Sequence, residues 1–164
     1  MALIPGGALV ENLQGLAQQI VDVTSEIFSS MVMMEVTSDA TLLPTLGSLR
    51  SSITGMVGLA GTHKGVLAIH IPNQLALAIT GSFLGMEVES VNEDVQDAVG
   101  ELANMLGGNI KGILSERGRD IALSLPSTIS GEQYFFQALN DVDTLIIPFN
   151  APAGTFHVEL QLEK

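Results

Sequence analysis

The sequence has 164 residues, with 6 lysine and arginine residues against 18 aspartate and glutamate residues, which gives a formal net charge of −12. A surface this acidic repels phosphate backbones and anionic lipid, so we expect neither nucleic-acid binding nor membrane insertion. The absence of cysteine excludes disulfides, thiol nucleophiles and thiolate-bound zinc, and it fits a reducing compartment. The first residues lack the basic start of a signal peptide, and we expect a cytoplasmic protein. The length predicts a single domain over residues 1–164.

The first half of the chain predicts a helix, a hairpin and a second helix. Apolar residues recur at steps of three and four from about 9 to 30, which predicts an amphipathic helix. Strand-like runs at 52–60 and 66–71 flank a glycine-containing turn and predict a hairpin. A short helix should follow, with Asn73 as its N-cap and Gly85 as its stop.

A long third helix and several strands are predicted for the second half. The segment Ser90–Glu93 matches a capping box, and apolar periodicity then continues to about Leu114. In the last strand Phe156 and its alternate neighbours are apolar, whereas Glu159 and Gln161 belong to a polar face that should contact water. One covered face favours antiparallel pairing. We therefore expect an α+β fold, with long helices packed on a largely antiparallel sheet. The strands are predicted at 121–125, 134–139, 144–149 and 155–162.

The common catalytic motifs are missing. The sequence contains no phosphate-binding loop, no dinucleotide fingerprint, no HExxH zinc motif and no GxSxG nucleophile elbow. Three histidines, His63, His70 and His157, are scattered through the predicted hairpins, where ordinary surface histidines are much commoner than metal ligands. We expect no metal or other cofactor bound by this chain.

The third helix carries a polar face opposite its buried face. At about 100° per residue, Glu101 and Asn104 lie together on the solvent side. Lys111 lies at the margin of this face, and an exposed helix face with acids and amides is by itself unremarkable. However, Gly107 and Gly108 lie within the helix, where each glycine costs about 1 kcal/mol relative to alanine. A bare stretch of backbone beside an acid and an amide could let another protein approach closely. The polar face comprises Asp97, Glu101, Asn104 and Gly108.

At these residues the chain resembles a known family. The spacing Asp97-x3-Glu101-x2-Asn104, followed by Leu106-Gly107-Gly108-Asn109, is similar to the motif of the CheC/CheX/FliY chemotaxis phosphatases, and Pro126 lies close to the proline of that motif. The order of predicted elements resembles the family's over essentially the whole chain. The resemblance implies CheC-like α/β layers built from two pseudo-symmetric halves.

The resemblance also implies an activity, namely hydrolysis of the phospho-aspartate of a CheY-like response regulator. Glu101 would contact a cationic side chain of the regulator, and Asn104 would orient a water for in-line attack. An acyl phosphate is already reactive, so positioning matters more than a strong base. Mg²⁺ would be held by the regulator. Asp97, Gly108 and Lys111 are the further candidates for binding this partner.

A possible second copy of the motif lies in the first helix, as Asp22-x3-Glu26-x2-Ser29. A serine hydroxyl cannot reproduce the two-ended hydrogen bonding of a carboxamide, so we expect this copy to be silent. One functional helix per chain resembles CheX more than CheC, and the resemblance to CheX implies a homodimer. The two acids are as readily explained by chance as by ancestry.

The sequence is also compatible with two other functions. A non-catalytic module of the same fold could dock on a response regulator, a flagellar switch or a receptor, because binding needs only the exposed face. A small-molecule site between helices and sheet has no supporting motif.

Overall fold

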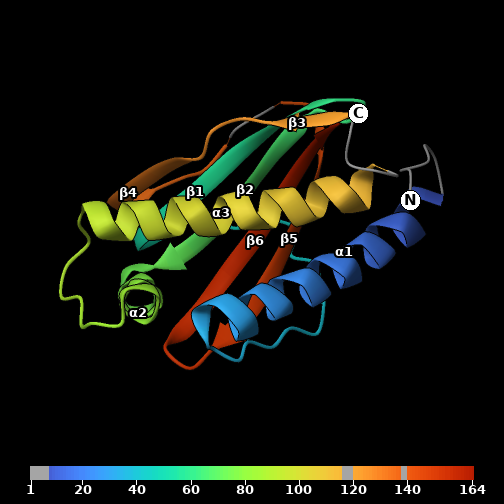
Figure 1. The fold of residues 1–164 in the computed structure, drawn as a ribbon. Helices are drawn as coiled ribbons and strands as arrows, with labels where there is room; N and C mark the ends of the chain where they lie inside the picture. The colour runs from blue at the N-terminus through green and yellow to red at the C-terminus, as the bar shows by residue number, and fades with distance from the viewer. Residues whose placement is uncertain (1–7, 116–119, 138–139) are drawn as a thin grey trace.

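The computed structural model describes residues 8–115, 120–137 and 140–164, with side chains from residue 13 onward. Three helices cover one face of a six-stranded sheet, as Figure 1 shows. The helices are α1 (Ala8–Ile27), α2 (Asn73–Leu84) and α3 (Glu93–Leu114), and a π-helical turn, η1 (Phe28–Val32), continues α1. The strands are β1 (Leu49–Gly61), β2 (Gly65–Pro72), β3 (Ile121–Leu123), β4 (Ser127–Tyr134), β5 (Val142–Ala151) and β6 (Gly154–Glu163).

All strand pairs are antiparallel, in the order β3-β1-β2-β6-β5, with β4 also paired to β1. A long helix precedes a hairpin in each half of the chain, with α1 before β1–β2 and α3 before β5–β6, although β3 and β4 lie between α3 and the second hairpin. The predicted α+β class, the three helices and the first hairpin are confirmed. The core lies between the helices and the sheet, where Phe156 stacks on Phe28 and Phe149 with ring centroids 4.7 and 5.0 Å apart.

The predicted ends of two helices are corrected by the structure. Asn73 is the first helical residue of α2 and Pro72 is the N-cap, because β2 runs directly into the helix. Gly85 ends α2 as predicted, with a φ of 67° that suits glycine. The N-cap of α3 is Asn92 and not Ser90, since the Asn92 side chain accepts a hydrogen bond from the Val95 N–H at 3.1 Å.

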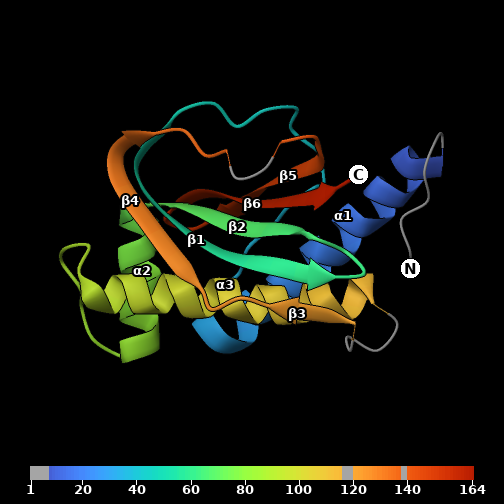
Figure 2. The same ribbon diagram turned by 90° about the horizontal axis from the view of Figure 1, so that it is seen from above.

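β3 and β4 follow one another along the same edge of β1 (Figure 2). Ser124 continues the pairing after β3, because its N–H donates to the Gly58 carbonyl at 2.9 Å and its Oγ accepts from the Gly58 N–H at 2.7 Å. The edge is then interrupted at Leu125 and Pro126 before β4 begins. The strand predicted at 134–139 is therefore misplaced, since β4 ends at Tyr134, and residues 138–139 lie outside the described part.

The second face of the sheet is also covered, contrary to the sequence-based prediction. Glu159 and Gln161 are buried on this face of β6. Segments around Pro44–Gly47 and Phe135–Gln137 lie over it, on the side away from the helices (Figure 2), and enclose a hollow of about 520 Å³ with these two side chains. The antiparallel arrangement is thus correct, but the middle of the polar face of β6, at Glu159 and Gln161, is shielded from bulk water, whereas Glu163 at its end is exposed.

Candidate functional site

α3 presents the predicted polar face as one unbroken helix from Glu93 to Leu114. Asp97, Glu101 and Gly108 are exposed, whereas Asn104 and Lys111 are partly buried. The Asn92 cap and the acidic first turn suit the positive end of the helix dipole and stabilise the start of this helix. The helix therefore brings Glu101 and Asn104 side by side, one turn apart, as the sequence predicts.

Two glycines set how closely α3 lies against β1 and hence which face remains outside. A Cβ atom on Gly55 would lie 2.8 Å from the Val99 carbonyl oxygen, and one on Gly107 would lie 2.8 Å from Val57 Cγ2. Both distances are too short for real Cβ contacts, so a side chain at either position would force its neighbour to move, and at Gly55 that neighbour is backbone. Gly107 faces the sheet, so of this pair only Gly108 contributes bare backbone to the surface. The predicted exposed pair of glycines is thereby corrected to one.

The Glu101 carboxylate and the Asn104 carboxamide are available to another molecule. Among the described residues, neither side chain makes a hydrogen bond or ion pair. Asn109 differs, because its Nδ2 donates to the Met105 carbonyl oxygen of the same helix at 3.0 Å. The exposed Asn109 is thus occupied by the backbone of its own helix, whereas the partly buried Asn104 can bind a water or a partner.

A groove runs between α3 and the start of β4, and we call it the α3–β4 groove. Its volume is about 390 Å³. Pro126, a residue of the predicted motif, reaches the site here because the break between β3 and β4 places it beside α3. Gly100 and Thr128 were not predicted, since their role depends on contact between segments distant in the sequence. The groove is lined by Gln96, Asp97, Gly100, Glu101, Pro126 and Thr128.

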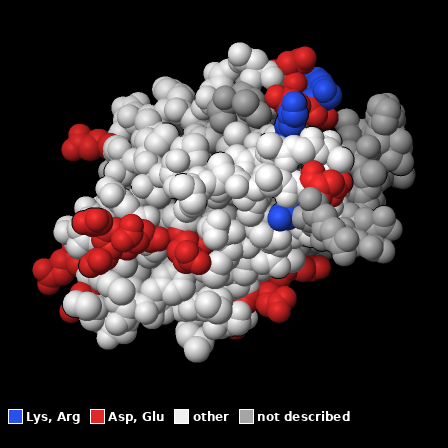
Figure 3. All heavy atoms as spheres, turned by 45° about the horizontal axis from the view of Figure 1, so that its top comes forward, with Lys and Arg blue, Asp and Glu red and all other residues white. Residues whose placement is uncertain are grey.

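The electrostatic character of this surface is acidic. Glu93 and Asp94 are exposed in the first turn of α3, and Asp97 and Glu101 continue along the helix. Figure 3 shows a row of acidic side chains on the side of the molecule where α3 begins, with no lysine or arginine among them in that view. A cationic group on a partner would be attracted to this side.

The possible second copy of the motif is arranged differently. Asp22 and Glu26 are exposed on α1, but Ser29 follows in the π-helical turn. The Ser29 hydroxyl donates to the Glu26 carbonyl oxygen at 3.3 Å, and the Asp22 carboxylate accepts from Gln18 Nε2 at 3.0 Å. The two side chains thus have partners within their own helix. That this copy is silent remains a prediction.

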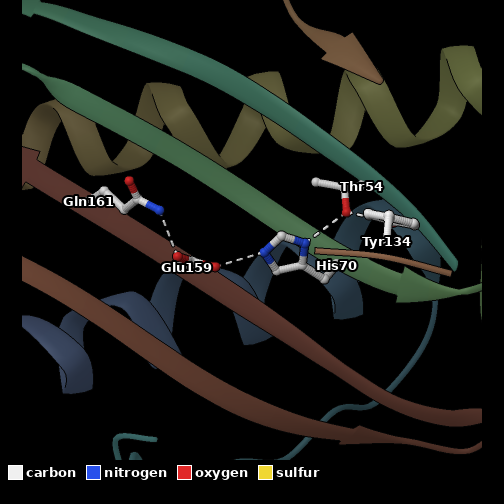
Figure 4. A network of polar contacts seen from close by, with 5 residues as sticks. All are labelled: Thr54, His70, Tyr134, Glu159 and Gln161. Carbon is white, nitrogen blue, oxygen red and sulfur yellow. Dashed lines mark hydrogen bonds and ion pairs between the residues drawn. The ribbon is translucent and has the colours of Figure 1, made fainter. Parts of the chain in front are cut away.

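A buried polar network crosses the second face of the sheet from β4 to β6 (Figure 4). His70 Nδ1 lies 2.7 Å from Thr54 Oγ1, and its Nε2 lies 2.9 Å from Glu159 Oε1. Tyr134 Oη lies 2.8 Å from Thr54 Oγ1, and Gln161 Nε2 donates to Glu159 Oε2 at 2.7 Å. Burial raises the pKa of the Tyr134 hydroxyl above its usual value, although its bond to Thr54 acts in the opposite direction.

The histidines do not form a metal site within the described residues, which contain no cluster of three His, Cys, Asp or Glu side chains suited to a metal ion. His70 and His157 are opposite one another on β2 and β6, and His63 lies in the β1–β2 turn. Burial lowers the pKa of His157, and the neighbouring His70 acts in the same direction. No helix of the described chain is both long and apolar enough to span a bilayer.

Known proteins resemble the chain in sequence and in fold. A curated relative, the CheY-P phosphatase CheX of Thermotoga maritima, is 28% identical over 81 residues, which are 49% of this chain and 52% of the relative. This match thus spans about half of the relative's length. The crystal structure of a chemotaxis protein CheX from Desulfovibrio desulfuricans has a TM-score of 0.80 at 27% identity, with 91% of this chain and 99% of that chain covered.

A third similar structure is a CheX-CheY-BeF3-Mg complex from Borrelia burgdorferi, with a TM-score of 0.68 over 90% of this chain and 97% of that chain. Its 19% identity shows a shared fold alone. The family model described as chemotaxis phosphatase CheX matches residues 53–150, which is more than half of the chain and includes α3, Pro126 and β4. The chain therefore belongs to the chemotaxis phosphatase CheX family.

Proposed function

We propose that this protein hydrolyses the phospho-aspartate of a CheY-like response regulator. The observation that carries the proposal is the unpartnered pair of Glu101 and Asn104 on the outer face of α3. Family membership supports it, as do the relative named CheY-P phosphatase and the similar fold of a CheX protein in complex with CheY. The row of carboxylates on α3 provides an attractive surface for a cationic partner.

In the proposed reaction the two side chains have separate tasks. Glu101 contacts a cationic side chain of the regulator and holds α3 over the phosphorylated aspartate. Asn104 accepts a hydrogen bond from a water with its Oδ1 and aligns that water with the phosphorus. The new bond forms between the water oxygen and phosphorus, and the bond to the aspartate oxygen breaks. The products are inorganic phosphate, which takes the water's protons, and a free carboxylate. Mg²⁺, which the regulator would hold, would supply the positive charge that balances the phosphoryl oxygens.

The test measures phosphate loss from a phosphorylated regulator with wild-type protein and with Asn104→Ala. We expect the wild type to accelerate the loss and Asn104→Ala to lose most of that acceleration while it still binds. Asn109→Ala is the matched control, because it removes an exposed carboxamide from the same helix that is already bonded to the backbone. Equal rates for Asn104→Ala and wild type would contradict the assigned role. Binding without any acceleration by the wild type would instead favour the non-catalytic module.

We also propose that the protein is a cytoplasmic homodimer, as the resemblance to CheX implies. Exposed apolar side chains such as Ile129 and Phe135 on the second face of the sheet support a further contact surface there. The molar mass in solution, measured by light scattering over a range of concentrations, tests this proposal. A mass equal to that of one chain at all concentrations would contradict it.

A further inference from the structure

The α3–β4 groove adjoins the proposed reaction site without being part of the water-positioning geometry. Glu101 borders the groove, whereas Asn104, one turn further along the helix, does not line it. The groove therefore extends from Glu101 toward the start of α3, away from the amide that would orient the water. A partner seated over Glu101 and Asn104 must cover or fill this hollow.

The base of the groove is bare because Gly100 lacks a side chain. A Cβ atom at Gly100 would meet Pro126 Cβ at 3.7 Å and Thr128 Cγ2 at 3.8 Å, which are ordinary contact distances. Alanine would thus fit the free protein, unlike at Gly55, where it would collide with the Val99 carbonyl. Glycine weakens a helix interior relative to alanine. Internal packing does not require Gly100, so the space is better explained by an occupant.

The chemistry of the lining defines that occupant. Among the described residues that line the groove, the charged side chains are the carboxylates of Asp97 and Glu101, while Pro126 supplies an apolar wall. Leu125, next to Pro126 in the chain, is 88% exposed and extends the apolar surface beside it. A long basic side chain matches this combination, since its aliphatic stem can pack on apolar atoms while its charged end meets a carboxylate.

We propose that the α3–β4 groove receives a basic side chain of the regulator, distinct from the one that Glu101 contacts at the reaction centre, and so contributes to the choice of regulator. This inference rests on the proposed function. The stem lies over Gly100 and Pro126, and the cationic end lies beside Asp97. Regulators with an acidic or short residue at the corresponding position bind more weakly, because Asp97 then meets no opposite charge.

The experiment measures affinity for a regulator held in its active state by beryllofluoride and Mg²⁺, so that binding is separated from hydrolysis. The CheY-like regulators of the same organism are each used as the probe. We expect Gly100→Ala and Asp97→Asn each to weaken binding about tenfold. Both should raise KM for phosphate release more than they lower kcat. The weakening caused by Asp97→Asn should shrink at high salt, whereas that of Gly100→Ala should remain.

Two controls distinguish the groove from folding and from the catalytic proposal. Gly112→Ala adds a methyl group at an exposed position of the same helix, where the new Cβ would meet no side chain and no backbone outside the helix within 4 Å. This variant should leave the affinity for the activated regulator unchanged. The Tm of Gly100→Ala should be no lower than that of the wild type. A lower affinity in this variant would then not result from unfolding. Wild-type affinity in both Gly100→Ala and Asp97→Asn would overturn the groove proposal, even where hydrolysis by the wild type is intact. Absence of binding by the wild type to every activated regulator would overturn it as well.

Discussion

Replacing one member of the buried His70–Glu159 contact should destabilise the fold strongly. The two side chains are 0% and 6% exposed, and Nε2 and Oε1 are 2.9 Å apart. His70→Leu leaves the Glu159 carboxylate buried with the Gln161 amide, and it removes one of the two partners of the Thr54 hydroxyl, which keeps only Tyr134. Breaking a buried pair in this way costs about 3–5 kcal/mol. For a domain of this size that corresponds to a fall in Tm of about 6–20 °C.

The assay is urea unfolding followed by circular dichroism for His70→Leu, Glu159→Leu and the double variant. We expect the double variant to be destabilised by less than the sum of the single ones, because it leaves neither group unpaired. His63→Leu, which alters a histidine in the β1–β2 turn, is the control and should change stability by less than about 0.5 kcal/mol. Two results would refute the view that this contact stabilises the second face of the sheet. One is a loss of less than about 1 kcal/mol in the free energy of unfolding for each single variant, and the other is strict additivity of the two losses in the double variant.

Three further predictions concern backbone packing and pH. Gly55→Ala should lower the free energy of unfolding, measured in urea, by about 1–3 kcal/mol, because its Cβ would lie 2.8 Å from the Val99 carbonyl oxygen. An unchanged free energy of unfolding would mean that α3 can shift freely on β1. At Gly108 an added Cβ would meet no side chain and no backbone outside its own helix within 4 Å, so Gly108→Ala should raise the free energy of unfolding by up to about 1 kcal/mol. The same variant should lower kcat/KM for the phosphorylated regulator, and an unchanged kcat/KM would remove Gly108 from the contact surface. Burial holds the pKa of His157 below the ordinary value of a histidine, so the unfolded chain takes up this proton first as the pH falls. Stability should therefore decrease as the pH drops through the ordinary titration range of histidine. His157→Gln should flatten the fall, and an unchanged pH profile would contradict it.

The helices and the first hairpin were predictable because their signals are local. Periodicity, turn residues and a stop at Gly85 are all contained within short stretches of sequence. The N-cap of α3 was misassigned by two residues because Ser90 and Asn92 are both suitable caps, and only the structure shows which side chain reaches Val95. Local patterns therefore identify elements more reliably than their exact ends.

The second face of the sheet could not be predicted because its cover comes from irregular segments. Glu159 and Gln161 alternate with apolar residues, and that pattern normally indicates a face open to water. The segments that cover them, around Pro44–Gly47 and Phe135–Gln137, have no periodicity that would reveal it. One partner of Glu159, His70, is 89 positions away in the chain. No local pattern connects them.

In the candidate site, too, some features follow from local sequence and others from contacts between distant segments. Glu101 and Asn104 lie on one helix, so their proximity follows from spacing alone, and the sequence was sufficient to predict that proximity. Their roles remain predictions. Which way they point depends on Gly55 and Gly107, whose lack of side chains lets α3 settle on β1 in one rotational setting. A larger residue at either position would push or turn the helix away from β1, and the pair would turn with it. The outward direction of the acid and the amide is therefore a property of the helix–sheet contact, although their spacing belongs to the helix alone.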